Sequence, residues 1–196
     1  DLPASVWCAR SPGKGGLFVR ITTKKLTTLG LLVGVSIVLG RIVPVIVPFA
    51  GIQALRISFG QVPVMLAGLL FGPAAGAVTG VLADFIGSSL FPIGPYFPGF
   101  TLSYAVFGFL PVIIWRQFPR QKAGYWTLFL AVFVTSLVVS ILNTLWLAIL
   151  SRQAVWVLLP PRLLASLLQV PLHALILHYS MQGYEAYSRS LSRQSS

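Results

Sequence analysis

Charged residues are almost absent from the interior of this sequence. No charge lies between Lys25 and Arg41, and Asp84 is the only charged residue between Ile57 and Trp115. A soluble domain uses about 25% charged residues to cover its surface, whereas here they make up 9%. Apolar segments of about 20 residues are long enough to cross a bilayer. The pattern therefore predicts an integral membrane protein and argues against a water-soluble globule.

Glycine and proline divide the apolar sequence into helical segments and loops. The second helix is short, because the eleven residues of 61–71 reach only about 16 Å, or half a bilayer. Segment 47–60 is predicted as a loop with a short extended piece, and 91–99 and 151–160 as further loops. The fold class is an all-α integral membrane protein, a compact bundle of six transmembrane helices at 26–46, 61–71, 74–91, 100–115, 125–150 and 161–182.

The basic residues flank the apolar segments, which indicates membrane orientation rather than nucleic-acid binding despite the net charge of +11. Six helices place both chain ends on one side, where ten of the fourteen Lys and Arg residues then lie. Both termini are therefore predicted to be cytoplasmic, with a basic N-terminal segment at 1–25, a membrane domain at 26–182 and a tail at 183–196. Residues 1–25 lack the pattern of a cleaved signal peptide. The four basic residues predicted on the outer side are Arg41, Arg56, Arg152 and Arg162.

Asp84 is the first candidate functional residue, since an intramembrane carboxylate is costly and is usually paired or functional. Arg41 and Arg56 are its candidate partners. These arginines also have a second interpretation, because the planar guanidinium grips carboxylates and two of them at the outer end of the bundle would suit an anionic substrate. A structural ion pair, arginines that extend to lipid headgroups, and a substrate site all remain open.

The segment 91–100, FPIGPYFPGF, combines proline stiffness with aromatic rings. Interfacial aromatic residues often serve only as membrane anchors. A rigid aromatic loop is also what stacking on a planar ligand requires. Its Pro95, Tyr96 and Phe97 are candidate ligand residues.

Polar residues form stripes on the last two predicted helices. Ser136, Ser140 and Asn143 share one face of 125–150, and Ser166, Gln169, His173 and Ser180 share one face of 161–182. Such stripes either hold helices together by hydrogen bonds or line a pocket for a heteroaromatic ring. Both interpretations stay open.

Small residues recur at every fourth position, at Gly68, Gly72, Gly76 and Gly80, which predicts close approach of the second and third helices. No phosphate-binding loop and no catalytic motif are visible, so ATPase activity is not expected in this chain. The single cysteine, Cys8, is too few for an internal disulfide or a Cys-based metal site.

Residues 56–103, RISFGQVPVMLAGLLFGPAAGAVTGVLADFIGSSLFPIGPYFPGFTLS, resemble the folate-specific S components of energy-coupling factor (ECF) vitamin transporters. The run LFPIGPYFPGFTLS is the most specific part, and the resemblance extends over about 26–182. It implies a bacterial membrane protein that captures folate from outside, without a cofactor of its own. The implied partners are a transmembrane coupling (T) component and two ABC ATPases, which would hold ATP and magnesium, with membrane lipid around the chain.

The family's docking motif AxxxA corresponds here to Gly30 and Gly34, with Leu31, Leu32 and Val33 between them. Together, the residues and the resemblance predict no metal site, no catalytic residue and one substrate site. The predicted substrate-binding residues are Arg41, Arg56, Phe59, Asp84, Pro95, Tyr96, Phe97, Tyr104, Asn143, Gln169 and His173.

Three alternatives to a folate-binding component stay open at this point. One is an S component for another vitamin or a heteroaromatic precursor. Another is a membrane-embedded enzyme using Asp84 and His173. The last is an assembly subunit without a ligand.

Overall fold

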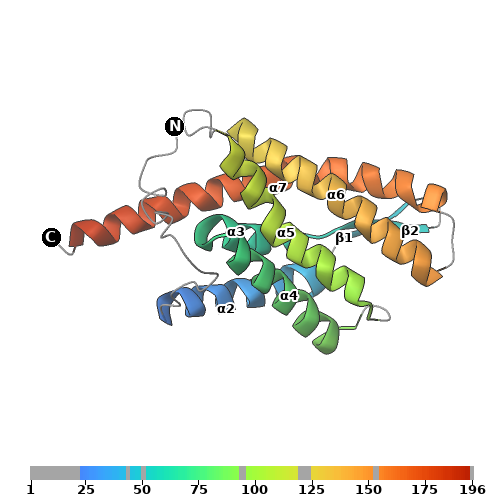
Figure 1. Ribbon diagram of the computed structural model, residues 1–196, viewed down its shortest axis with the longest axis horizontal. Coiled ribbons are helices and arrows are strands. Elements are labelled where there is room, and N and C mark those ends of the chain that lie inside the picture. Colours follow the sequence, from blue (N-terminus) through green and yellow to red (C-terminus); the bar gives the residue numbers. More distant parts are fainter. Residues whose placement is uncertain are drawn as a thin grey trace.

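The computed structural model describes residues 23–42, 45–49, 52–92, 96–118, 125–151 and 155–194. Within them, six α-helices, one π-helix and one β-hairpin follow each other along the chain (Figure 1). The elements are α2 (Thr23–Ile37), the π-helix η1 (Val38–Ile42), β1 (Val45–Phe49), β2 (Ile52–Ile57), α3 (Gln61–Phe71), α4 (Pro73–Leu90), α5 (Pro98–Gln117), α6 (Tyr125–Ser151) and α7 (Val155–Gln194). Residues 1–22 of the predicted basic segment 1–25 lie outside the described residues, and residues 23–25 begin α2.

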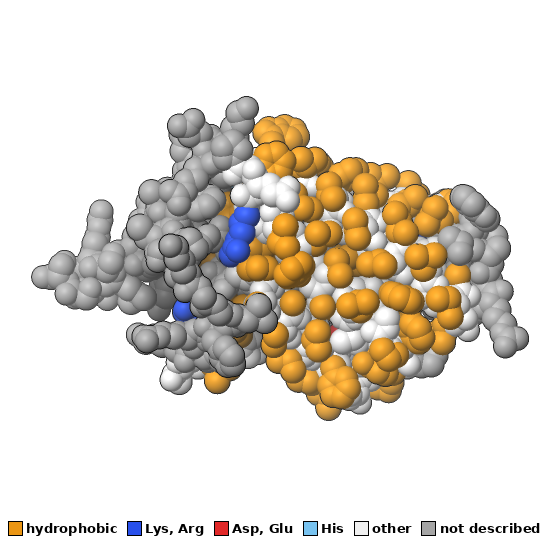
Figure 2. Space-filling view, viewed as in Figure 1, with side chains coloured by type: hydrophobic (Ala, Val, Ile, Leu, Met, Phe, Trp, Pro, Cys, Tyr) orange, Lys and Arg blue, Asp and Glu red, His pale blue; other side chains and the backbone are white. Residues whose placement is uncertain are grey.

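Five of the helical segments are long and apolar enough to cross a membrane. They are Lys25–Ile42, Pro73–Leu90, Pro98–Gln117, Tyr125–Leu150 and Arg162–Tyr184, and α3 is the shorter apolar helix. The face in Figure 2 is covered mainly by hydrophobic side chains, as a lipid-facing surface must be. The predicted six-helix membrane bundle with a short second helix is confirmed.

The end of the first helix differs from the prediction. It ends at Ile42 instead of residue 46, and an antiparallel hairpin of β1 and β2 follows, with Val45 paired to Ile57. Pro44 lacks an N–H group, and the apolar residues around it are β-branched, so the sequence here favours strand over helix. The strand register shifts between Val47 and Phe49, on either side of Pro48, which has no N–H to give the ladder. The predicted extended piece of loop 47–60 is thus a two-stranded hairpin.

The last helix is longer than the predicted 161–182. It begins at Val155, before Pro160 and Pro161, and continues through Gly183 to Gln194. The apolar run of 155–159 extends it at the start, and one glycine inside a helix costs only about 1 kcal/mol. The predicted loop 151–160 is therefore shorter, and part of the predicted tail is helical.

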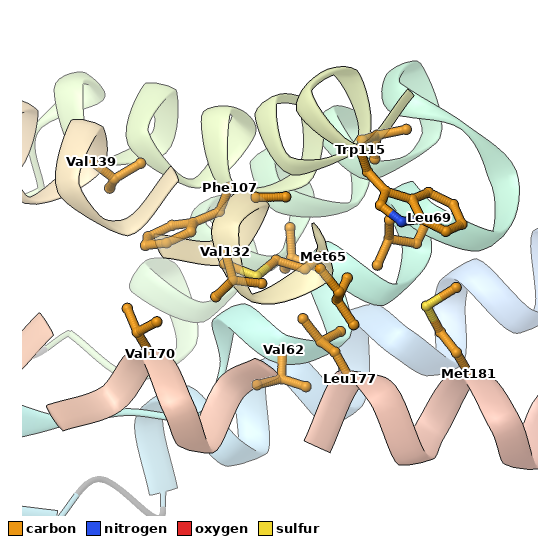
Figure 3. Packing of buried hydrophobic residues seen from close by; sticks show 14 of the residues in the cluster. Val62, Met65, Leu69, Phe107, Trp115, Val132, Val139, Val170, Leu177 and Met181 are labelled. Atoms are coloured by element: carbon orange, nitrogen blue, oxygen red, sulfur yellow. The ribbon is translucent and has the colours of Figure 1, made fainter. Parts of the chain in front are cut away.

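Helix α3 is the centre of the bundle. It packs against α2, α4, α5 and α7, and none of its residues is exposed. Figure 3 shows its side chains Val62, Met65 and Leu69 among apolar residues of α5, α6 and α7. The remaining labelled members of this core are Phe107, Trp115, Val132, Val139, Val170, Leu177 and Met181.

Glycines bring α3, α4 and α5 into backbone contact, which extends the predicted approach of α3 and α4 to a third helix. A Cβ atom built on Gly68 or on Gly76 would overlap the carbonyl oxygen of Gly108, and one on Gly80 would overlap the carbonyl oxygen of Tyr104. Gly72 has a φ of 108°, which glycine adopts readily, and it turns the chain from α3 into α4.

The two ends of the bundle differ. Figure 1 shows, toward the left, the first residues of α2, the last residues of α7, the end of α5 and the start of α6. The hairpin lies toward the right, together with the end of α6 and the start of α7. The right-hand side is called the hairpin end below.

Candidate functional site

A partly buried ion pair joins η1 to α4. Arg41 Nη2 lies 3.1 Å from Asp84 Oδ1, and the exposed fractions of the two side chains are 16% and 4%. Asp84 was predicted to pair with Arg41 or Arg56, and the structure pairs it with Arg41. The side chain of Arg56, on β2, lies outside the described part of the chain.

The second oxygen of Asp84 extends this pair into a network. The Thr101 hydroxyl, in the first turn of α5, donates to Asp84 Oδ2 at 2.8 Å. Because that proton points to the carboxylate, the Tyr96 hydroxyl donates to Thr101 Oγ1, at 3.0 Å. Arg41 Nη1 also donates to the Phe91 carbonyl at 3.4 Å. The network therefore connects η1, α4 and α5 with both Phe91 and Tyr96 of the predicted aromatic loop.

Thr101 was not among the predicted residues. The sequence offered one signal, since its hydroxyl lies close after the aromatic segment in a span with few polar groups. Pro95, also predicted, lies outside the described residues.

The aromatic residues at the start of α5 divide between two neighbours. The ring of Tyr96 meets that of Phe85 edge to face, with centroids 6.1 Å apart. Phe97 instead faces Trp146 of α6, at 5.7 Å. A Cβ on Gly99 would lie 2.6 Å from both the Phe97 and the Trp146 rings, so glycine permits this close packing. Tyr104, one turn further along α5, packs edge to face against Phe107.

A second polar cluster lies where the hairpin meets α7. His173 Nε2 is 3.1 Å from the Ser58 carbonyl oxygen. A carbonyl can only accept, so Nε2 carries the proton of this bond. The His173 ring also meets the Phe59 ring edge to face at 5.8 Å. The predicted residues Phe59 and His173 are thus in direct contact.

Glycine and serine residues tie this second cluster to η1. The Ser36 hydroxyl donates to the Gly60 carbonyl at 2.6 Å. A Cβ on Gly60 would lie 2.7 Å from the Cα of Gly40, so the segment after β2 rests directly on η1. The Tyr104 hydroxyl and Ser58 Oγ lie 3.7 and 3.9 Å from the Cβ position of Gly40. Residues from α5 and from the segment after β2 thereby meet around one glycine.

Several buried polar atoms of the described residues have no hydrogen-bond partner. They include three acceptors, Gln61 Oε1, Asn143 Oδ1 and His173 Nδ1, and one donor, Trp146 Nε1. Such groups are rare in folded proteins, since leaving one unpaired costs about 1–3 kcal/mol. Asn143 and His173 were predicted, whereas Gln61 and Trp146 were missed because a sequence does not reveal which polar groups lack partners.

The other predicted residues are placed as follows. Gln169 of α7 is half-buried. Gly30 and Gly34 lie on an exposed face of α2, and no neighbouring atom of the described residues lies within 4 Å of their Cβ positions. The Ser166 hydroxyl donates to the Leu163 carbonyl of its own helix, so this member of the stripe serves the helix itself. Among the described residues, no three His, Cys, Asp or Glu side chains are placed to share a metal ion.

These features define a class: a helical membrane protein that keeps aromatic rings and unpaired hydrogen-bonding atoms inside its bundle, as a protein that binds a small molecule does. The sequence profile of the family described as ECF transporter, substrate-specific component, matches residues 24–180. The chain belongs to this family of substrate-binding transport proteins, and it is not an enzyme. The alternative of a membrane enzyme using Asp84 and His173 is therefore wrong, and the structure engages these two residues with different partners.

Named relatives are similar over most of the chain. The folate transporter FolT of Clostridium novyi (strain NT) is 37% identical over 134 residues, which are 66% of this chain and 76% of that protein. The folate transporter FolT of Leuconostoc mesenteroides subsp. mesenteroides is 24% identical over 173 residues, covering 85% of this chain and 89% of that protein.

Solved structures share the fold. A crystal structure of FolT bound with folic acid matches with a TM-score of 0.63 and 28% identity, covering 81% of this chain and 92% of that one. The S component of a bacterial ECF transporter matches with a TM-score of 0.65 and 22% identity, covering 86% of this chain and 98% of that one.

Proposed function

We propose that this chain is the folate-binding S component of an ECF-type importer. It captures folate from the outer side of a bacterial cell membrane and passes it inward through an ATP-driven module on partner chains. The observation that carries the proposal is the 37% identity to a protein named as a folate transporter, over 76% of its length. The fold shared with a FolT that holds folic acid supports the same ligand.

The chemistry of the described residues suits folate. Folate has a flat pterin ring, an aromatic linker and a glutamate tail with two carboxylates. Unpaired acceptors at Asn143 and His173 and an unpaired donor at Trp146 match the mixed edge of a pterin. Phe59, Phe97 and Tyr104 add ring faces, and arginine suits the carboxylates.

We extend the predicted ligand residues by two that the structure adds, Gln61 and Trp146. The complete proposed set is Arg41, Arg56, Phe59, Gln61, Pro95, Tyr96, Phe97, Tyr104, Asn143, Trp146, Gln169 and His173, with Asp84 acting beside Arg41.

Both termini are proposed to face the cytoplasm, so that the hairpin end faces outward. The Lys and Arg side chains visible in Figure 2 lie toward the end opposite the hairpin, in support of this orientation. The proposed partners are a transmembrane coupling component and two ABC ATPases that bind ATP and magnesium. The face of α2 with Gly30 and Gly34 is proposed to dock on the coupling component, because no other part of the described chain covers it.

The ligand is tested by isothermal titration of the purified full chain in detergent with folate, 5-formyltetrahydrofolate and unsubstituted pterin. Saturable binding of the folates at one site per chain is the expected result. A vitamin with a different ring system, such as thiamine or riboflavin, is the matched control. Absence of heat with every folate, or tighter binding of a control vitamin, contradicts the proposed cargo.

Partner dependence is tested by uptake of labelled folate into vesicles. Vesicles with this chain alone should not accumulate folate against a gradient, because it has no phosphate-binding loop. Adding the coupling component and the ATPases with ATP should produce uptake. Uphill uptake by the isolated chain would overturn the S-component role.

A further inference from the structure

Asp84 is the one acidic side chain that the structure describes, and its environment is unusual for a simple ion pair. The two carboxylate oxygens bind two different partners, Arg41 at 3.1 Å and Thr101 at 2.8 Å. A carboxylate held through both oxygens cannot rotate, so the direction of its bond to Arg41 is fixed.

The two members of the pair differ in access to the surroundings. The Asp84 side chain is 4% exposed, whereas that of Arg41 is 16% exposed. The Arg41 side chain is therefore the more accessible member of the pair, and Asp84 would repel an incoming anion in any case.

The Arg41 guanidinium also has more N–H donors than these contacts use. It carries five N–H groups in a rigid plane. One nitrogen, Nη2, serves Asp84, and Nη1 makes a long bond of 3.4 Å to the Phe91 carbonyl. At least two N–H groups remain for another acceptor after these bonds are made.

We propose that Asp84 is a positioning residue that orients the Arg41 guanidinium toward a carboxylate of the ligand tail. Thr101 fixes this orientation through its hydrogen bond to the second oxygen of Asp84. This inference rests on folate as the ligand. Fixing one rotamer of a long flexible side chain before binding removes an ordering cost that the complex would otherwise bear. Asp84 then acts on affinity without touching the ligand, and Thr101 becomes a specificity-determining residue by the same route.

The experiment compares folate with its bis-amide, in which both tail carboxylates are capped as neutral amides and the rings are unchanged. Titration of the full chain gives the ratio of the two affinities, which we call the carboxylate preference. Wild type should prefer folate by about tenfold or more, as a charge-assisted hydrogen bond predicts. Asp84→Asn should lower this preference to about threefold or less and change bis-amide affinity by no more than about twofold.

Thr101 supplies a variant that keeps the ion pair. Thr101→Val preserves shape and removes the hydroxyl, so the carboxylate preference should fall, whereas Thr101→Ser restores the hydroxyl and should restore the preference. A double variant, Arg41→Asp with Asp84→Arg, rebuilds the pair with its charges exchanged. It should regain thermal stability relative to Asp84→Asn without regaining the preference, because the guanidinium now starts from α4.

Three outcomes would contradict either the positioning role of Asp84 or the proposed function. Equal losses for folate and bis-amide in Asp84→Asn and Thr101→Val would show a purely structural pair and overturn the inference. A wild-type chain that binds folate and bis-amide equally would overturn it too, while leaving the cargo intact. A wild-type chain that binds neither ligand would refute the proposed function itself.

Discussion

Gly76 of α4 and Gly108 of α5 touch backbone to backbone. A Cβ added to either one would overlap the carbonyl oxygen of the other. Neither carbonyl belongs to a flexible side chain that can turn aside, so the two helices must separate to admit even a methyl group.

Gly76→Ala or Gly108→Ala should therefore destabilise the protein, by at least the upper end of the 1–3 kcal/mol that is typical of overpacking, about 3 kcal/mol. Thermal unfolding in detergent measures the effect. Gly183→Ala is the matched control, because no neighbouring atom of the described residues lies within 4 Å of its Cβ position in α7, and there alanine should be neutral or stabilising. Equal melting temperatures for Gly76→Ala and wild type would refute the close contact.

Asn143→Ala should weaken folate binding by about 1–3 kcal/mol, or roughly 5- to 150-fold. Its buried Oδ1 has no hydrogen-bond partner in the described structure, so removing it breaks no bond of the unliganded fold. Stability should therefore change little while affinity falls. Titration and thermal unfolding of the same variant measure both quantities.

Thr144 is the control for this prediction, since its buried hydroxyl donates to the Ser140 carbonyl of its own helix at 2.7 Å. Thr144→Val should leave folate affinity unchanged. An Asn143→Ala protein that melts lower and keeps wild-type affinity would make Asn143 an interhelical contact and remove it from the site.

Trp146→Phe should lower folate affinity by about three- to tenfold, as expected for one lost hydrogen bond. The substitution keeps an aromatic ring beside Phe97 and removes the Nε1 donor, which is buried and unpaired among the described residues. Titration with folate measures the change. Trp126, which is 78% exposed on the same helix, gives the control variant Trp126→Phe. The same affinity in both variants would mean that Nε1 does not meet the ligand.

Gly30→Leu together with Gly34→Leu should impair docking on the coupling component and spare folate binding. Within the described part of the chain, no neighbouring atom lies within 4 Å of either Cβ position, so there is room for the larger side chains. A flat glycine face lets a partner helix approach closely, and leucine would push it away.

Co-purification with the coupling module measures docking, and titration measures binding. Gly183→Leu is the control for bulk at an open glycine. Loss of folate binding in the double variant would show that these glycines serve the fold instead.

The membrane bundle followed from the sequence because charge, glycine and proline act locally. The short helix 61–71 has the same bounds in α3, since Gly60 and Gly72 mark its two ends. The hairpin was predicted only as a short extended piece, because a strand is stabilised by its neighbour and the pairing of Val45 with Ile57 cannot be seen in either segment alone. The predicted bounds of α7 were wrong because Pro160, Pro161 and Gly183 do not interrupt this long helix.

The candidate site was only partly predictable for a related reason. The sequence predicted that Asp84 forms an ion pair with Arg41 or Arg56, and in the structure it pairs with Arg41. It could not show that Thr101 and Tyr96 continue the network, because their placement depends on how α5 starts beside α4. Gln61 and Trp146 look unremarkable in sequence, and only the packed bundle shows that their polar atoms are buried without partners.

The central position of α3 has a consequence for the surrounding lipid. A helix that spans half the bilayer would create a hydrophobic mismatch if it touched lipid, and the membrane would have to thin around it. Because α3 is enclosed by α2, α4, α5 and α7, the bilayer meets only full-length helices there. The perimeter of the protein can thus keep a constant thickness although α3 is short, and rearrangement at the hairpin end need not perturb the lipid seal.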